Sequence, residues 1–271
     1  MEISILLAEQ ILAMFLTMAV GFGVVRAGLF KTEDSRIISN MVVYICNPCV
    51  VVHSFQIELT DDKIKGLMIA IGLSVVVHMV LIIGSEILSF IFHFNSIEKA
   101  SIIYTNAGHL VIPLVGAVLG EEWVFYTTAF ILVQTVLMWT HGVKLIGQEK
   151  ELNIRKILCN PNVIAMIIGI ALFALEIRLP TVVDSCVSGF GDMISPASMM
   201  VIGMVIGDVD LKWVFRQKRP YLICLLRLIV FPLIAVVAFA GLERSGIHPD
   251  AEYILMIVLI ATSAPAAAMI T

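Results

Sequence analysis

The chain has 271 residues, of which 60% are hydrophobic and only 14% charged, and its formal net charge is −4. Soluble domains typically carry about 25% charged and about 45–50% apolar residues. One aqueous core cannot hide this excess of apolar side chains, so the chain is predicted to fold in lipid. The composition excludes a cytosolic enzyme, a secreted disulfide scaffold and a disordered linker. The scattered charges give no field that would attract nucleic acid.

Apolar stretches of bilayer-spanning length, roughly 20 residues, follow one another along the chain. The first, 3–26, lacks the basic start and small-residue cleavage pattern of a signal peptide, so we interpret it as a retained span. The other spans are predicted near 33–56, 64–92, 97–119, 122–146, 157–177, 181–207, 219–241 and 252–271. The fold class is therefore an all-α integral membrane protein with nine spans, and its short loops leave no room for a soluble enzyme domain.

The orientation follows from the Lys and Arg residues of the short loops, which favour the cytoplasmic side. If the first span runs from outside to inside, most of these residues lie inside, including those of the basic loop 212–219. We therefore expect a multi-pass protein of the plasma membrane with its amino terminus outside.

Four spans carry a proline near their centre, where the missing amide donor and a steric clash disturb a helix. They are the second, fourth, seventh and ninth spans, with Pro48, Pro113, Pro196 and Pro265. The pattern recurs after five spans, which predicts a five-helix unit over 1–148 that is repeated over 149–271. Because five is odd, the second copy is inverted in the membrane. Weak similarity between 39–48 and 187–196, and between 105–108 and 262–265, supports the repeat.

Inverted repeats with broken helices are typical of secondary transporters, whose substrate site lies near the bilayer midplane. Irregular backbone at that depth must face protein or a water-filled cavity. If spans 4 and 9 cross at their breaks, two half-helix amino termini point their free N–H groups at one place. Such a place favours an anion, in particular a carboxylate.

Six stretches with these features resemble the auxin efflux carrier family, which includes plant hormone exporters and bacterial malate/malonate-type carriers. The stretches are 40–48, 105–114, 160–169, 195–203, 227–232 and 264–269. The resemblance implies ten spans in two inverted five-helix repeats, with crossed broken helices 4 and 9. It also implies a scaffold of spans 1, 2, 6 and 7 that mediates dimerisation, and a transport domain of spans 3–5, 8 and 9. The implied activity is movement of organic anions, by charge-driven uniport or with proton coupling.

The sequence departs from the family pattern in two places. It stops six residues after Pro265, so the second half of span 9 and all of span 10 are missing, and we expect a truncated chain whose activity is in doubt. At Thr262, Ser263 and Ala264, many members have an Asn or a second Pro beside the breaking proline. The span-4 side is therefore expected to supply more side-chain donors.

The candidate substrate-binding residues lie at the four disturbed positions. Asn106 is the strongest of them, because its amide can reach a substrate oxygen or satisfy the freed backbone. Asn47 and Ser195 each directly precede a proline. Each of them either caps the broken turn or touches the ligand. The full set is Asn106, Gly108, Pro113, Ser263, Pro265, Asn47 and Ser195.

Ionisable residues within spans are costly and are candidates for proton coupling. His78 and Glu86 lie eight residues apart, about two helical turns, and share a helix face. His109 follows the span-4 glycine, and Asp192 either acts in coupling or pairs with Arg227. These four residues, His78, Glu86, His109 and Asp192, are the coupling candidates. Gln134 and His141, seven residues apart on span 5, are weaker candidates for a polar pathway.

The sequence thus predicts a secondary carrier that moves a small carboxylate by alternating access, with no catalytic residue, cofactor or metal. Its partners are the substrate, lipid and a second copy of the chain. One alternative is a sodium symporter or sodium/proton antiporter with related broken helices, although those need carboxylates at the crossover. An intramembrane hydrolase and a non-transporting receptor are further alternatives, and the first lacks its protease motifs here.

Overall fold

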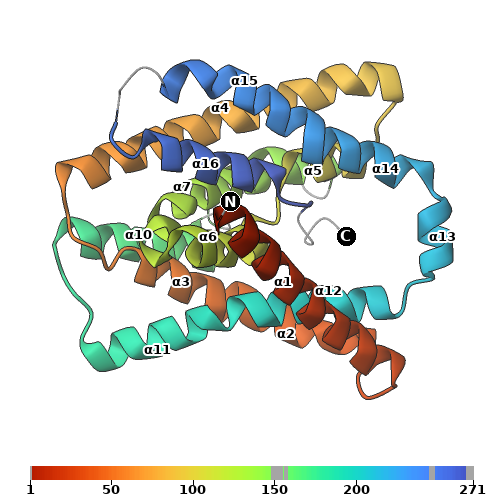
Figure 1. The fold of residues 1–271 in the computed structure, drawn as a ribbon, viewed down its shortest axis with the longest axis horizontal. Coiled ribbons are helices and arrows are strands. Elements are labelled where there is room, and N and C mark those ends of the chain that lie inside the picture. The colour runs from red at the N-terminus through yellow and green to blue at the C-terminus, as the bar shows by residue number, and fades with distance from the viewer. Residues whose placement is uncertain (1, 148–154, 156–157, 244–247, 267–271) are drawn as a thin grey trace. The chain divides into compact units, whose positions relative to one another are not determined.

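The computed structural model describes residues 2–147, 155, 158–243 and 248–266 (Figure 1). The regular elements in these ranges are helices, and the extended backbone is limited to one isolated antiparallel bridge. Six helical segments are long and apolar enough to cross a membrane: Ala8–Arg26, Thr32–Ser54, Asp61–Phe92, Glu121–Ile146, Thr181–Gly207 and Lys218–Phe239. The prediction of an all-α, multi-pass membrane protein is confirmed.

The remaining predicted spans are shorter or divided. The spans near 157–177 and 252–271 contain α10 (Pro161–Ala174) and α16 (Ala251–Ser263), which are each under 18 residues. The span near 97–119 is divided into α5 (Ser96–Ile103) and α6 (Ile112–Leu119), with the π-helical turn η3 (Ala107–Val111) before α6. Only the spans that carry Pro113 and Pro265 are therefore interrupted by extended backbone in the described part of the chain.

The chain forms two compact units, each built from three stretches of sequence. Unit 1 comprises Met1–Glu58, Gly108–Val124 and Ile164–Lys218, and unit 2 comprises Leu59–Ala107, Phe125–Val163 and Arg219–Thr271. Besides α6 and most of α10, unit 1 holds α1 (Glu2–Arg26), η1 (Thr32–Asp34), α2 (Ser35–Met41), η2 (Val42–Cys46), α3 (Asn47–Ser54), η4 (Glu121–Trp123), α11 (Thr181–Asp192), α12 (Ile194–Gly207) and α13 (Leu211–Arg216). Besides α5 and α16, unit 2 holds α4 (Asp61–Phe92), α7 (Val124–Leu137), η5 (Met138–Gly142), α8 (Val143–Ile146), α14 (Lys218–Leu225), η6 (Leu226–Val230) and α15 (Phe231–Glu243).

Glycines allow α1 and α12 of unit 1 to approach closely, and Figure 1 shows the two helices crossing. A Cβ atom on Gly203 would lie 2.0 Å from the backbone oxygen of Met18, and one on Gly21 would lie 2.3 Å from that of Met200. Gly203 and Gly207 form a G-x-x-x-G pattern, which lets membrane helices pack backbone against backbone. Since lipid supplies no hydrophobic force between helices, this van der Waals contact is what holds α1 on α12.

At Pro48 and Pro196 the predicted disturbance is milder than a break, because the helical backbone continues through both prolines. The π-helical turn η2 directly precedes α3, and Pro48 lies in the first turn of α3. Helices α11 and α12 meet at Met193, whose backbone is itself helical, and Pro196 falls in the first turn of α12. A proline removes one hydrogen bond from the turn before it, and here a π-helical turn or a single turn residue accommodates that loss without extended backbone.

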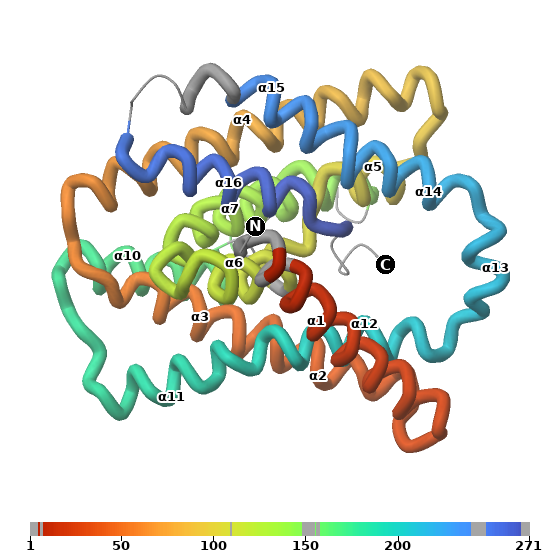
Figure 2. The backbone as a smooth tube through the Cα atoms, viewed as in Figure 1, coloured from red at the N-terminus to blue at the C-terminus, as the bar shows by residue number. Residues whose placement is uncertain are grey.

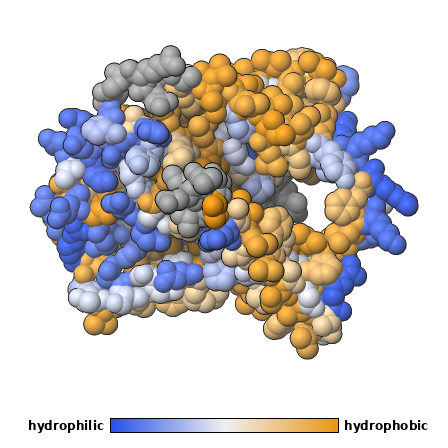
Figure 3. All heavy atoms as spheres, in the orientation of Figure 1, coloured by the Kyte–Doolittle hydropathy of each residue, from blue (hydrophilic) through white to orange (hydrophobic). Residues whose placement is uncertain are grey.

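Unit 2 packs α16 against both α4 and α15, and the smooth trace in Figure 2 shows these three helices running alongside one another. The ring of Phe231 lies over Gly84, where a Cβ atom would come within 2.5 Å of it. On its outer side α15 exposes Leu233, Ile234 and Val237, and Figure 3 shows hydrophobic side chains over its visible surface. An apolar outer face of this kind suits lipid as its solvent.

Candidate functional site

Two interruptions in unit 2 lie side by side and form the centre of the candidate site. The first, 104–106, follows α5 and is extended at Tyr104, and the second, 264–266, follows α16 and is extended at Ala264. Thr105 and Ala266 pair as an antiparallel bridge, and the Asn106 amide donates to the Pro265 carbonyl at 2.8 Å. We call these two segments the paired interruptions.

Gln134 of α7 holds the first interruption in place. Its Oε1 accepts from the Thr105 backbone amide at 2.9 Å and from the Thr105 hydroxyl at 2.8 Å, and its Nε2 donates to the Thr105 carbonyl at 2.8 Å. Both residues are buried. Backbone polar groups that a helix no longer satisfies must find a partner inside protein. Gln134 therefore replaces the missing helical hydrogen bonds at this position.

Arg227 binds the carboxyl ends of both interrupted helices. Its Nε donates to the Ala264 carbonyl at 2.7 Å, and its Nη1 donates to the carbonyls of Ser101, at 2.9 Å, and Ile102. Ser101 and Ile102 lie in the last turn of α5, and Ala264 follows α16. Helix carboxyl ends carry partial negative charge, so the guanidinium is electrostatically favoured between them.

The charge of Arg227 is not neutralised by a carboxylate within the described residues. The side chain is only 2% exposed, and its Nη2 is buried without a hydrogen-bond partner among the described residues. Its Nε and Nη1 are directed at backbone carbonyls of unit 2. Within unit 2, the described groups that hold the cation are therefore neutral. The predicted pair with Asp192 stays a prediction.

The predicted anion site at two half-helix amino termini stays a prediction. The first half-helix begins at Ala107, after the amides of Thr105 and Asn106, which donate to Gln134 and Pro265. The corresponding turn after the second interruption falls on residues 267–271, outside the described residues. Arg227, for which a structural pair was one predicted role, adds a positive charge at the paired interruptions.

Asn106 is the predicted ligand-binding residue whose side chain is best placed for that role. It is 6% exposed, and its side-chain amide makes no hydrogen bond to any residue in the described ranges. The hydroxyl of Ser263 donates to the Leu259 carbonyl at 2.8 Å. Pro265 contributes its carbonyl to the backbone of Asn106. Within the described ranges, the amide of Asn106 therefore has no competing hydrogen-bond partner.

The predicted coupling residues of unit 2 have separate partners. His78 is fully buried on α4, donates from Nδ1 to the Ser74 carbonyl at 2.7 Å, and leaves Nε2 without a partner in the described chain. Since a carbonyl only accepts, this bond assigns the proton to Nδ1. Glu86 instead accepts from the ammonium of Lys99 at 2.7 Å. The side chain of His109 lies outside the described part of the structure.

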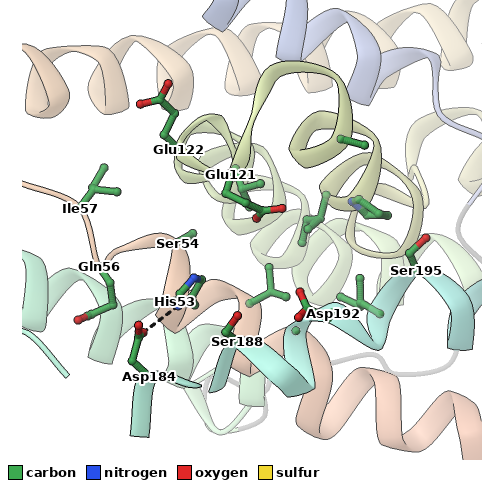
Figure 4. Close-up of a pocket in the computed structure, with 17 residues that line it drawn as sticks. His53, Ser54, Gln56, Ile57, Glu121, Glu122, Asp184, Ser188, Asp192 and Ser195 are labelled. Atoms are coloured by element: carbon green, nitrogen blue, oxygen red, sulfur yellow. Dashed lines mark hydrogen bonds and ion pairs between the residues drawn. The ribbon is translucent and has the colours of Figure 1, made fainter. Parts of the chain in front are cut away.

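A second polar region lies wholly within unit 1, where a cavity of about 460 Å³ collects side chains from α3, α6 and α11 (Figure 4). Three predicted residues line it: Pro113, Asp192 and Ser195. Its other carboxylates are Glu121, Glu122 and Asp184. The Oδ1 atom of Asp184 lies 2.9 Å from the Nδ1 atom of His53. No Lys or Arg is among the described residues that line the cavity. Its charge therefore disfavours an anion.

The remaining two predicted residues, Asn47 and Gly108, lie against each other in unit 1. A Cβ atom on Gly108 would lie 3.3 Å from the Nδ2 atom of Asn47, so the absence of a side chain lets the amide approach the backbone. Asn47 is 7% exposed, and its Oδ1 has no partner among the described residues. No group of three or more His, Cys, Asp or Glu side chains that could hold a metal ion occurs in the same part of the chain.

Long apolar helices, together with the shorter helices α5 and α16 that stop at paired extended segments around buried polar side chains, define a multi-pass membrane protein with discontinuous helices. The family described as "Membrane transport protein" matches residues 6–155 and 148–271, which together cover nearly the whole chain. The chain belongs to this family, and the predicted relationship to the auxin efflux carriers is confirmed. The comparison with curated proteins gave no match.

Proposed function

We propose that the protein is a secondary carrier that moves a small carboxylate across the plasma membrane by alternating access. Membership of a transporter family supports the general activity. The observation that carries the choice of substrate class is the buried amide of Asn106, which is unbonded within the described residues and lies at interruptions that contain a cation and no carboxylate. A substrate carboxylate accepts hydrogen bonds, which is what these groups offer.

The proposed transport cycle uses the division of the spans that the family resemblance implies. Spans 3–5, 8 and 9 move as a transport domain against a scaffold of spans 1, 2, 6 and 7, and the scaffold forms a homodimer. The interrupted helices belong to the transport domain, so the substrate travels with them. His78 is the proposed proton carrier, because it is a fully buried ionisable residue on a span of the transport domain. The amino terminus lies outside.

The rival function, a sodium symporter or sodium/proton antiporter, requires acidic ligands at the interruptions. Residues 101–113 and 258–266 contain no Asp or Glu. A hard cation is bound by oxygen ligands that include carboxylates, whereas donors and a guanidinium favour an anion. Sodium-dependent uptake would support the rival.

We expect Asn106→Ala to abolish stabilisation of the purified protein by carboxylates. A hydrogen bond to a charged group contributes about 1.5–3 kcal/mol, so affinity should fall roughly 10- to 150-fold. The measurement is the shift in Tm on titration with acetate, malonate, succinate and malate. Ser85→Ala is the matched control, because it removes another buried side-chain oxygen of unit 2 that bonds only to its own helix.

The control should keep the wild-type response to each carboxylate. An Asn106→Ala protein that is stabilised as strongly as the wild type would show that the amide does not contact the substrate, and the site assignment would then be wrong.

A further inference from the structure

We propose that Arg227 is the anchoring residue for the substrate carboxylate, which it binds through the two N–H groups of Nη2. The inference rests on the proposed function and adds a residue that faces the substrate with a full positive charge.

The donor count of the guanidinium leaves one nitrogen free. Arginine has five N–H donors, one on Nε and two on each Nη. The Nε donor is used by Ala264, and the two Nη1 donors are used by Ser101 and Ile102. Nη2 is buried and has no partner among the described residues. Charged donors buried without an acceptor are costly, and a substrate anion would supply the acceptor that Nη2 lacks.

The groups that hold Arg227 fix its position without competing for the ligand. All three are backbone carbonyls at helix carboxyl ends, whose partial negative charges attract the guanidinium. A carboxylate side chain in their place would occupy the donors that the substrate needs. The same arrangement ties the guanidinium to both interrupted helices, so an anion bound to it is fixed to the element that the proposed function requires to move.

Arg227 and Asn106 are attached to neighbouring peptide units. The Ala264 carbonyl accepts from Nε of Arg227, and the next carbonyl, that of Pro265, accepts from the backbone amide of Asn106. The guanidinium and the backbone of Asn106 are thus held at the same short segment. Nη2 of Arg227 and the side-chain amide of Asn106 can each donate to one oxygen of a carboxylate.

The irregular backbone around Arg227 has a local cause. Arg227 lies in η6, a π-helical turn between α14 and α15, and Pro232 follows this turn as Pro48 follows η2 and Pro113 follows η3. Proline disturbs the turn that precedes it. Pro232 therefore accounts for the π-helical turn, and the binding role of Arg227 rests on its donors and on the groups that hold it.

The test compares carboxylates with their neutral amides on wild type, Arg227→Gln, Arg227→Lys and the control Arg219→Gln. The probes are acetate, malonate and succinate against acetamide, malonamide and succinamide, and the readout is the Kd from the titrated shift in Tm. Arg219→Gln is the same substitution at an exposed position, where the arginine donates to the Phe92 carbonyl and forms an ion pair with Glu98. It therefore controls for the loss of one positive charge.

We expect the wild type and Arg219→Gln to bind carboxylates and to reject the amides. Arg227→Gln should bind the carboxylates roughly 10- to 100-fold more weakly and lose the discrimination against amides. Arg227→Lys should recover part of the affinity, because it restores the charge without the planar fork. A residue that only supports the fold would lower Tm without changing the preference for carboxylate over amide.

Two failures are distinguishable. If no carboxylate stabilises the wild type, both the proposed function and this inference are wrong. If the wild type binds carboxylates and Arg227→Gln binds them with unchanged Kd, only the inference is wrong. Should Arg227→Gln fail to fold, the wild-type comparison still decides, since equal affinity for succinate and succinamide would show that no cation anchors the ligand.

Discussion

Gly203→Leu is expected to remove most of the folded protein, because the added side chain has no space at the α1–α12 crossing. The first atom of any side chain would lie 2.0 Å from the Met18 carbonyl oxygen and 2.8 Å from the Phe22 amide nitrogen. Overpacking typically costs about 1–3 kcal/mol when side chains can adjust. Here the obstacle is backbone, so we expect the upper end of that range or more, with a fall in Tm of roughly 6–12 °C.

Two measurements in detergent check this result. Thermal unfolding gives the Tm, and size-exclusion chromatography gives the amount of folded protein. Gly23→Leu is the control, because Gly23 lies on α1 and a Cβ atom there would meet no atom within 4 Å. It should behave as the wild type. A Gly203→Leu protein with the same Tm as Gly23→Leu would mean that α1 does not pack on α12 through its backbone.

Gln134→Leu is expected to cause the second large loss, because it removes three hydrogen bonds from one buried residue. Without Gln134 the amide, hydroxyl and carbonyl of Thr105 lose their partner at the first interruption. Each buried polar group left unsatisfied costs about 1–3 kcal/mol. The predicted loss for the two backbone groups alone is therefore about 2–6 kcal/mol, measured as a lower Tm and weaker carboxylate-dependent stabilisation.

Thr127→Val on the same helix is the matched control. Thr127 is fully buried, and its hydroxyl has no hydrogen-bond partner among the described residues. Replacing an unsatisfied hydroxyl by a methyl group of similar shape should be neutral or stabilising. Equal effects of Gln134→Leu and Thr127→Val would indicate that Gln134 does not hold the interruption.

The sequence was sufficient for the fold class and for the position of both interruptions. Apolar stretches of bilayer length locate the spans, and Pro113 and Pro265 mark the interrupted helices. The sequence was not sufficient to distinguish Pro113 and Pro265 from Pro48 and Pro196, which have similar flanking residues. Pro113 shares with Pro48 both the first-turn position and a preceding π-helical turn, so the difference lies in the extended backbone at Tyr104 and Ala264. Such local geometry depends on packing that a linear pattern does not contain.

For the candidate site, the sequence pointed to Asn106 but not to the hydrogen bonds that Arg227 makes. An arginine inside an apolar span is a signal in itself, since it must bind something. Its acceptors, however, lie 37 residues away at Ala264 and 126 residues away at Ser101. Backbone carbonyls have no sequence signature, so a carboxylate was the only partner that the sequence could suggest. The same limit applies to Gln134, whose partner Thr105 is 29 residues distant.

The most direct test of the account is counterflow of radiolabelled succinate and malonate into proteoliposomes that contain the full chain. The account predicts saturable uptake that is driven by unlabelled carboxylate inside, is not driven by the corresponding amides, and is lost in Arg227→Gln and Asn106→Ala but kept in Arg219→Gln. Uptake by folded wild-type protein that does not exceed that of protein-free liposomes, or that requires sodium and is indifferent to the carboxylate, would contradict it.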